Sequence, residues 1–514
     1  MSLLGIDVGT TGCKAVVFSG EGAILASAYS EYDVARPQPG QATLDSSEVW
    51  AKIKSTIARA VVDTPPGDPI AALSVASMGE AVVPVSKERR ILGPSILIVD
   101  NRGAEQAARL RGKIDDISCY EITGNPVGNQ YGLTKLMWLK ESEPKLYDET
   151  YRFLNWAGFV SFMLGAEPHA DFSLANRMLL FDLERETWSD EMLAIAELDR
   201  EKLPDCVASG SPIGTVDPKI ADELHLPRGV LIAAGAHDQC ANSLGSGSLH
   251  TGTAMYGMGT FPTIVPVFAE RKSPAEMIRL GLNTEHHAVP GAYVSFIYHM
   301  GGSTVKWFRD TFAAEEHRQA ERRGEDIYPR LFDELPKAPG PLLILPHFAP
   351  MGPPDFLSDS SGVIVGLKTD TTRGEILKSV LEANNFAHRM TVDRLDSVGI
   401  AIESMRAVGG GSRSDSACQI CADIFNRPVL RPTVSEAGAF GAALLSGLSA
   451  GVYDSLEAAA RPRGRSERVF EPDPARVAAY EEIYQRYLRL RELATDFTRE
   501  LTAWKESSHY PRSR

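Results

Sequence analysis

The first residues that could do chemistry surround the turn at positions 9–12, which contains two glycines and two hydroxyl residues, Thr10 and Thr11. Successive backbone N–H groups in such a turn can bind an anion, and Lys14 stands beside it. Asp7 precedes the turn, and a carboxylate next to a bound phosphate indicates a Mg²⁺ ion between the two. The same residues also fit an ordinary tight hairpin between strands at 3–8 and 13–18. Phosphate binding and a plain hairpin both remain open from this segment alone.

A second candidate follows an apolar run in the middle of the chain. Residues 231–236 predict a buried strand, and the run ends at once in His237-Asp238-Gln239. Ligands of layered α/β proteins bind outside the carboxyl ends of the strands, so Asp238 and Gln239 are expected to face a cleft. Alternatively, Asp238 only caps the helix that follows.

Two glycine-rich stretches could approach a phosphate or a flat ligand. One follows the apolar strand expected before residue 257 and contains Gly259 and Thr260. The other ends a strand with three glycines and includes Gly410, Gly411 and Ser412, just before a helix whose N-terminus favours anions. Three glycines could also form a merely flexible turn.

Polar residues recur at two further strand ends. Gly79 and Glu80 follow the apolar run 72–76, and Asp100 and Arg102 follow the run 96–99. Most charged residues beside strands are simply solvated, but their repetition at strand ends favours one shared cleft.

The composition bounds the class of protein. A chain of 514 residues exceeds one ordinary core, so two domains are expected. A net charge of −14 without a basic cluster argues against nucleic-acid and anionic-membrane surfaces. The start of the chain resembles neither a signal peptide nor a membrane span, which points to the cytoplasm. The six scattered cysteines do not form a disulfide pattern, and Cys418 and Cys421 are expected in a buried helix.

Helical periodicity predicts the scaffold around these sites. Residues 45–62 form an amphipathic pattern that opens with a capping signature. Helices are also expected over 133–151, 151–164, 375–395, 436–445 and 474–501.

The ordered motifs resemble the FGGY carbohydrate kinases, a branch of the actin-like ATPase superfamily. They are LGIDVGTTGCKAVVF at 4–18, DNRGAEQA at 100–107, GAHDQ at 235–239, GMGT at 257–260, GGSTVKWFRD at 301–310, GVIVGL at 362–367, EILKSVLE at 375–382, AVGGGSRSD at 407–415 and EAGAFGAAL at 436–444. The resemblance implies an α/β fold of two ribonuclease-H-like domains around a central cleft, with boundaries at 1–245 and 246–514. It also implies ATP-dependent phosphorylation of a small sugar or polyol, and homodimer formation as a family-level expectation.

The resemblance assigns roles residue by residue. Asp238 matches the general base, and Asp7 together with Asp238 matches the carboxylates near Mg²⁺. On the substrate side the matching residues are Gly79, Glu80, Asp100, Arg102, Asp238 and Gln239. On the ATP side they are Thr10, Thr11, Lys14, Gly259, Thr260, Gly302, Lys306, Gly410, Gly411 and Ser412.

One departure from the family bears on the substrate. Glycerol kinases have Arg-Glu and xylulokinases Met-His where this sequence has Gly79 and Glu80, so it fits neither subgroup. A glutamate accepts hydrogen bonds from hydroxyls and repels carboxylates, which favours a neutral polyol or ketose over an aldonate. The rival hypotheses are a catalytically idle sugar sensor and a chaperone-like ATPase. The first would be favoured by loss of Asp7 or Asp238, which are both present, and the second needs a peptide-binding domain that the C-terminal residues do not supply.

Overall fold

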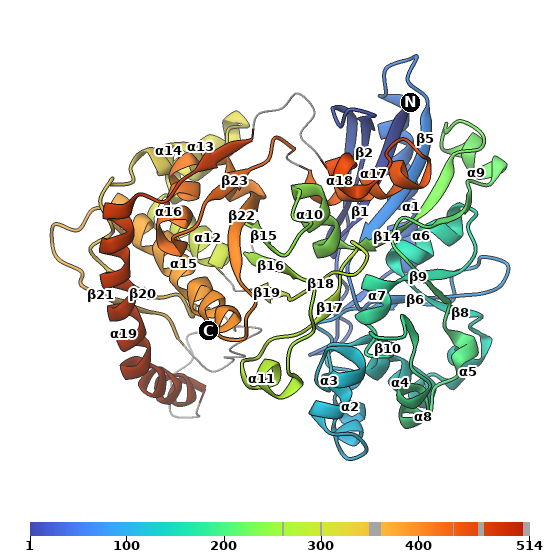
Figure 1. Ribbon diagram of the computed structural model, residues 1–514, viewed down its shortest axis with the longest axis horizontal. Coiled ribbons are helices and arrows are strands. Elements are labelled where there is room, and N and C mark those ends of the chain that lie inside the picture. The colour runs from blue at the N-terminus through green and yellow to red at the C-terminus, as the bar shows by residue number, and fades with distance from the viewer. Residues whose placement is uncertain (260–261, 299–300, 349–360, 435, 461–466, 507–514) are drawn as a thin grey trace.

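The computed structural model describes residues 1–259, 262–298, 301–348, 361–434, 436–460 and 467–506. Two lobes lie side by side in Figure 1. The blue N-terminal strands belong to the right-hand lobe, and the red helix α19 lies at the outer side of the left-hand lobe.

A six-stranded sheet forms the centre of the first lobe. Its order is β13 (Pro212–Thr215), β14 (Leu231–His237), β5 (Ile70–Ser77), β1 (Ser2–Val8), β2 (Gly12–Ser19) and β3 (Ile24–Glu31). The strands β1, β5 and β14 are mutually parallel, whereas β2, β3 and β13 pair antiparallel to their neighbours. The predicted strands at 3–8, 13–18, 72–76 and 231–236 are therefore confirmed.

The second lobe repeats this pairing pattern in a second sheet. The order is β17 (Glu285–His286), β18 (Tyr293–Val294), β16 (Thr263–Phe268), β15 (Gly252–Gly257), β22 (Ile402–Val408), β23 (Val429–Arg431) and β24 (Arg468–Phe470), with β19 (Ile297–Tyr298) also on β16. Here β15, β22 and β23 are parallel, while β16, β18 and β24 pair antiparallel. Two sheets with the same succession of parallel and antiparallel neighbours confirm the predicted pair of ribonuclease-H-like domains.

Helices cover the first sheet and build the outer part of its lobe. They are α1 (Ser46–Val62), α2 (Ala104–Arg111), α3 (Asp116–Thr123), α4 (Gly132–Ser142), α5 (Pro144–Glu149), α6 (Trp156–Leu164), α7 (Phe172–Asn176), α8 (Asp190–Ala196), α9 (Pro218–Glu223) and α10 (Asp238–Ser246). As the capping signature predicts, Asp45 accepts hydrogen bonds from the amides of Ser47 and Glu48 and begins α1. Side chains of α1 and α6, among them Ile53 and Phe159, form an apolar core with the sheet.

The second lobe has its own helical layer. It contains α11 (Pro274–Arg279), α12 (Gly301–Phe312), α13 (Ala314–Arg323), α14 (Tyr328–Asp333), α15 (Arg373–Ser397), α16 (Asp415–Phe425) and α19 (Pro474–Glu506). The helices α17 (Ala437–Ser449) and α18 (Leu456–Ala460) also come from the second half of the chain but lie in the right-hand lobe of Figure 1, where α17 packs on the first sheet. Cys418 and Cys421 are buried in α16, as expected, and all six cysteines are free thiols.

The helices α10 and α17 join the lobes by crossing between them. The helix α17, from the second half of the chain, packs against β1, β5 and β14 of the first sheet, and α10 contacts β15 and β22 of the second. Glycines permit this approach: a Cβ atom on Gly5 would lie 1.8 Å from the Ala439 carbonyl oxygen, and one on Gly245 would lie 1.9 Å from that of Ala437. The helices α10 and α17 therefore connect the first sheet with the second sheet.

Five short strand pairs lie outside the two large sheets. They are β4 (Thr43–Leu44) with β7 (Ser95–Ile96), β6 (Val82–Val85) with β8 (Arg152–Asn155), β9 (His169–Asp171) with β12 (Asp205–Val207), β10 (Phe181–Asp182) with β11 (Thr187–Trp188), and β20 (Leu343–Leu345) with β21 (Val363–Val365).

Three local predictions were wrong. The expected helix 151–164 begins as strand β8 and becomes helical only at Trp156, because apolar residues in a short run fit either structure. The helix expected over 133–151 is divided into α4 and α5 before Pro144. The strand expected at 96–99 is only the end of β7, so Asp100 follows a turn rather than a strand of the main sheet.

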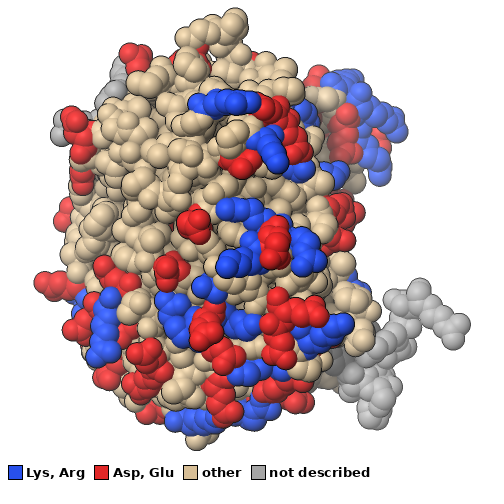
Figure 2. Space-filling model, turned by 90° about the vertical axis from the view of Figure 1, so that its right-hand side faces the viewer, with Lys and Arg blue, Asp and Glu red and all other residues tan. Residues whose placement is uncertain are grey.

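Charged side chains of both signs cover part of the outer face of the first lobe. Figure 2 shows Lys and Arg interspersed with Asp and Glu over the lower part of the face that it presents.

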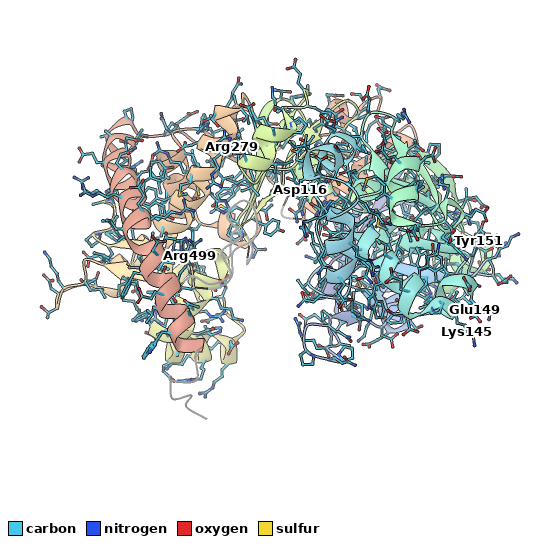
Figure 3. The ribbon with its side chains drawn as sticks, turned by 90° about the horizontal axis from the view of Figure 1, so that it is seen from below. Asp116, Lys145, Glu149, Tyr151, Arg279 and Arg499 are labelled. Carbon is cyan, nitrogen blue, oxygen red and sulfur yellow. The ribbon has the colours of Figure 1, made fainter. Side chains whose placement is uncertain are left out.

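Seen from below, Asp116 of α3 and Arg279 of α11 lie where the two lobes meet, whereas Tyr151 and Arg499 lie away from this contact (Figure 3). Among the described residues, no helix is long and apolar enough to span a membrane.

Candidate active site

Parallel pairing brings the first set of predicted residues to one edge of the first sheet. Asp7 in β1 and Ala236 in β14 are both in register with Ala76 in β5. Because these three strands are parallel, the residues after them, Gly79, Glu80 and Asp238, lie at the same edge. Asp238 is the first residue of α10 and the N-cap residue is His237, so the alternative in which Asp238 caps this helix is wrong.

Two carboxylates near this edge are unusually easy to protonate. Burial raises the pKa of Asp7 to about 6; Lys14 opposes this shift and Glu436 adds to it. Burial, and next the negative charge of Asp7, raise the pKa of Asp238 to about 7, with a smaller contribution from Glu80. Because the charges of Asp7 and Glu80 both act on Asp238, these three acids lie within electrostatic reach of one another.

A small pocket opens beside these carboxylates. It has a volume of about 220 Å³ and is lined by Asp7, Gln239 and Gly259, together with Asn242 and Glu436. Gly438, near the start of α17, completes it: a Cβ atom there would lie 2.6 Å from Oδ2 of Asp7. The predicted residues Asp7, Gln239 and Gly259 are thus brought together, while Thr260 lies outside the described residues.

A larger pocket adjoins the first. It has a volume of about 640 Å³, and its lining includes Lys14, Gly410 and Ser412 but also Glu436 and Arg431. A backbone φ of 86° at Gly409, which favours glycine, turns the chain after β22. The amide of Gly411 donates to the carbonyl of Met258 at 2.9 Å, which joins the two glycine-rich stretches that the sequence singled out.

The turn at 9–12 is closed by its own backbone and by a tyrosine. The amide of Gly9 donates to the carbonyl of Gly12 at 2.9 Å, and the Tyr32 hydroxyl donates to the carbonyl of Gly9 at 2.6 Å. Thr10 and Thr11 are exposed at this turn. Their hydroxyls are therefore open to a ligand in solution.

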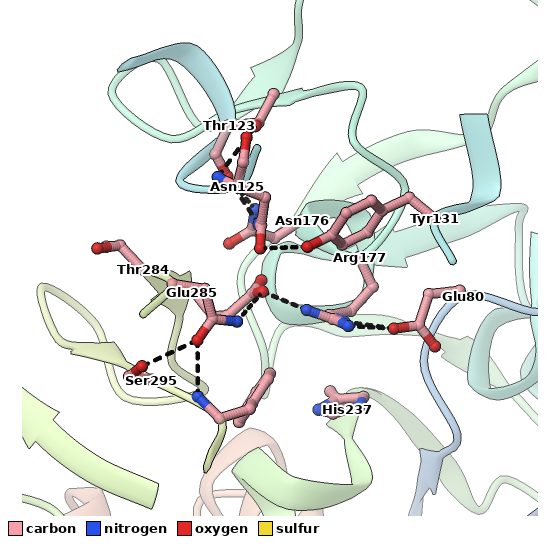
Figure 4. Close-up of polar contacts among 12 residues, drawn as sticks. Glu80, Thr123, Asn125, Tyr131, Asn176, Arg177, His237, Thr284, Glu285 and Ser295 are labelled. Atoms are coloured by element: carbon pink, nitrogen blue, oxygen red, sulfur yellow. Dashed lines mark hydrogen bonds and ion pairs between the residues drawn. The ribbon is translucent and has the colours of Figure 1, made fainter. Parts of the chain in front are cut away.

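Glu80 belongs to a buried ionic cluster that the sequence did not reveal. Arg177, the residue after α7, donates from Nε to Oε1 of Glu80 at 2.8 Å and also bonds Glu285 of β17 (Figure 4). Although burial alone would lower it, the carboxylates of Glu285 and Glu80 raise the pKa of Arg177 above its ordinary value. His237 lies beside the cluster, and its ring Nε2 is 3.3 Å from Oδ1 of Asp238.

Asp100 and Arg102 occupy a self-contained loop. The Asp100 side chain is fully buried and accepts hydrogen bonds from the amide of Ala42 and from the guanidinium of Arg102. The ammonium of Lys135 donates to the Arg102 carbonyl at 2.6 Å. The carboxylate of Asp100 therefore holds Arg102 and the loop.

Gly302 and Lys306 lie on α12 and do not line either of the two pockets. Lys306 is exposed, and α12 packs on α15 through Thr304 and Asn384.

The site also contains residues that sequence reasoning missed. Arg177 lies in a turn-rich segment without a readable pattern, and Glu285 lies 108 positions further along the chain. Glu436 and Gly438 stand within the motif EAGAFGAAL at 436–444, but neither was among the predicted site residues. No local signal could have paired Arg177 with Glu285.

Comparison with known families settles the class of enzyme. Models of the FGGY family of carbohydrate kinases match residues 2–245 as the N-terminal domain and 263–450 as the C-terminal domain. The chain belongs to this family. The predicted resemblance is confirmed, and the protein is a carbohydrate kinase.

Similar proteins span different substrates. The chain is 26% identical over 514 residues to the xylulose kinase of Lactococcus lactis subsp. lactis, covering 98% of this chain and 99% of that relative. It is 28% identical over 495 residues to the glycerol kinase of Methylibium petroleiphilum, covering 93% and 96%. The crystal structure of xylulose kinase from Rhodospirillum rubrum superimposes with a TM-score of 0.84 at 26% identity, covering 97% and 100%.

Proposed function

We propose that this FGGY kinase transfers the γ-phosphoryl group of ATP to a hydroxyl of a small neutral sugar or polyol, with Asp238 as the general base. The observation that carries the proposal is the juxtaposition of Asp238 with Asp7 beside the two pockets. A carboxylate whose pKa is raised to about 7 can take up a proton near neutral pH. The relatives named for xylulose and glycerol support a hydroxyl acceptor.

The transfer has a simple balance of bonds. A substrate oxygen attacks the γ-phosphorus, its O–H bond breaks, and the proton passes to the carboxylate of Asp238. The bond from the γ-phosphorus to the bridging oxygen breaks, and ADP leaves with that electron pair. Positioning and charge neutralisation dominate such reactions, which fits a site with one base and several anion-binding groups.

We assign the larger pocket to the nucleotide. Lys14, Gly410 and Ser412 line it, and Gly411 lies in the same turn. Thr10, Thr11 and Gly259 would contact the phosphates from the two neighbouring turns. Gly302, Lys306 and Thr260 are assigned to ATP by family resemblance alone.

Asp7 and Asp238 fit a Mg²⁺ ion. Each has a raised pKa, so a cation would relieve the cost of keeping both carboxylates ionised. Within the described ranges, no three acidic, histidine or cysteine side chains converge as a metal site of their own. This suits Mg²⁺, which is usually held by one or two carboxylates, waters and phosphate oxygens. When bound, the ion neutralises charge on the transferring phosphoryl group.

The substrate side is assigned to Gly79, Glu80 and Gln239, which adjoin Asp238. We assign Arg102 to the rim of this side, with Asp100 holding it in place. The domain boundary is proposed near residue 245, at the end of α10. Closure of the two domains would then exclude water from the attacking position.

The test is ADP release from ATP and Mg²⁺ across polyols, ketoses, aldoses and aldonates. One responsive acceptor is expected, and Asp238→Ala should lose about 10² to 10⁴ in turnover, the range for a positioned base. Glu382→Gln is the matched control, because Glu382 is also buried with a pKa raised to about 7 but lies beside Tyr480, outside the site. Near-wild-type turnover in Asp238→Ala would reject the base, and absence of ADP release with every acceptor would reject the kinase function.

A further inference from the structure

The guanidinium of Arg177 is held by two carboxylates and two aromatic rings. Its Nε and Nη2 groups donate to Glu80, and Nη1 donates to Glu285. The rings of Tyr131 and Phe296 lie 5.3 and 5.4 Å from its central carbon. Figure 4 shows Glu80 and Glu285 on opposite sides of Arg177. These contacts fix both the position and the orientation of the buried guanidinium.

Donors are left over at this cation. A guanidinium carries five N–H groups, and the three bonds to Glu80 and Glu285 leave two without an acceptor in the described part of the chain. Arg177 is only 7% exposed, so unsatisfied donors there are costly. Hydroxyl oxygens of a bound substrate would satisfy them.

A second unsatisfied group lies next to the cluster. His237 is 7% exposed, and its Nδ1 has no hydrogen-bond partner among the described residues. A neutral imidazole nitrogen can exchange a hydrogen bond with a hydroxyl. Its ring packs against Phe296 at 4.8 Å and reaches Asp238 through Nε2.

Gly79 is explained by the same cluster. A Cβ atom at this position would lie 3.1 Å from Nε2 of His237 and 3.3 Å from Cγ of Arg177. A longer side chain would occupy the space that these two residues fill. Where glycerol kinases have Arg-Glu and xylulokinases Met-His, this chain has Gly79 before Glu80. The space beside Gly79 is filled by Arg177, which follows α7 and supplies the positive charge.

Resting on the proposed kinase function, we infer that Arg177 binds substrate hydroxyls and that its cluster with Glu80 and Glu285 selects neutral polyhydroxylated acceptors over aldonates. The free donors of Arg177 bind a substrate hydroxyl, while Glu80 and Glu285 flank the guanidinium with negative charge. One guanidinium does not neutralise two carboxylates, so a substrate carboxylate is repelled. Glu285 acts through Arg177 as a positioning residue, and because it belongs to the second sheet, substrate recognition uses both domains.

The experiment compares wild type, Arg177→Lys, Glu285→Gln and the control Glu382→Gln with polyols, ketoses and aldonates of equal carbon number. We expect wild type to prefer the neutral acceptor by at least about 100-fold in kcat/KM. Arg177→Lys should raise KM for the acceptor by about tenfold with KM for ATP unchanged, since an ammonium lacks the planar set of donors with which a guanidinium can bind Glu80 and a substrate hydroxyl together. Glu285→Gln should reduce the ratio of kcat/KM for the neutral acceptor to kcat/KM for the aldonate by about tenfold, because it removes one negative charge.

The outcomes separate the two proposals. A wild type that prefers an aldonate, or unchanged acceptor KM in Arg177→Lys together with unchanged preference in Glu285→Gln, would overturn the inference but leave phosphoryl transfer with Asp238 as the general base standing. If no acceptor releases ADP but neutral polyols raise the Tm of wild type and not of Arg177→Lys, the kinase function fails and the inference stands. If Arg177→Lys does not fold, the preference measured in the isosteric Glu285→Gln decides. A panel without turnover and without any Tm shift would reject both.

Discussion

The ammonium of Lys14 lies 2.6 Å from a carboxylate oxygen of Glu436, and both residues line the larger pocket. Lys14 belongs to β2 of the first sheet, whereas Glu436 immediately precedes α17 in the second half of the chain. The side chains are 34% and 27% exposed, so solvent screens the pair and limits its strength. Phosphate oxygens and Glu436 would compete for the same cation.

This competition predicts opposite effects of two substitutions on nucleotide affinity. Glu436→Gln should lower the Kd for ATP by about threefold to tenfold, because it removes a competing anion and a negative charge facing the phosphates. Lys14→Met should raise the Kd by a similar factor. Titration calorimetry with ATP and Mg²⁺ measures both, and the difference should shrink at high salt. Equal Kd values for the two variants would show that Lys14 does not contact the nucleotide.

The pH dependence of turnover should follow Asp238. The proposed base acts when deprotonated and its pKa is raised to about 7, so activity is present above that pH and is lost as the pH falls through it. The loss of kcat/KM should approach tenfold per pH unit below the inflection. A cation beside Asp7 and Asp238 favours their ionised forms, so raising the Mg²⁺ concentration should move the inflection to lower pH. An inflection that does not respond to Mg²⁺ would argue against the ion at these carboxylates.

Gly438 is expected to be essential for the position of Asp7. In Gly438→Ala the new methyl group would lie 2.6 Å from Oδ2 of Asp7, so the carboxylate must move. Turnover should fall by about 10 to 100-fold, because small displacements of reacting groups are costly, while a helical alanine keeps the fold. Mg²⁺ binding in the presence of ADP should weaken as well.

Gly20→Ala is the matched control for this substitution, because the nearest atom to its Cβ would be an ordinary 3.5 Å away. Turnover in Gly438→Ala equal to that of Gly20→Ala would show that Asp7 tolerates displacement.

The parts that the sequence predicted are those with strong local signals. Alternating and continuous apolar runs marked β1, β2, β5 and β14, and the ends of these strands located Asp7 and Asp238 at the same edge. Residues 152–155 were predicted as helix, because pairing with β6, rather than local preference, makes them a strand. The contact of Arg177 with Glu285 depends on packing of α7 against β17, which no periodicity encodes. Site residues were predictable where a motif is continuous in sequence and not where the fold assembles them.

The last prediction concerns stability at Glu382, which is 1% exposed and accepts hydrogen bonds from the Tyr480 hydroxyl at 2.7 Å and the amide of Gly340. Burial raises the pKa of this carboxyl to about 7 from 4.5. The folded state therefore binds a proton that the unfolded chain has released, and its stability declines as the pH rises from about 4.5 to about 7. Glu382→Gln removes this titration. Between about pH 5 and about pH 8, the free energy of unfolding of the variant relative to wild type should rise by up to about 3 kcal/mol. For a chain of 514 residues this corresponds to a change of about 3 °C in the Tm difference. Calorimetry at both pH values measures this change.

Glu481→Gln is the control for this prediction. The pKa of Glu481 is lowered by its hydrogen bond from Gln485, so the Tm difference between Glu481→Gln and wild type should stay constant across this range. A Tm difference for Glu382→Gln that is equally constant would mean that Glu382 is ionised throughout and is stabilised by Lys378, 3.8 Å away.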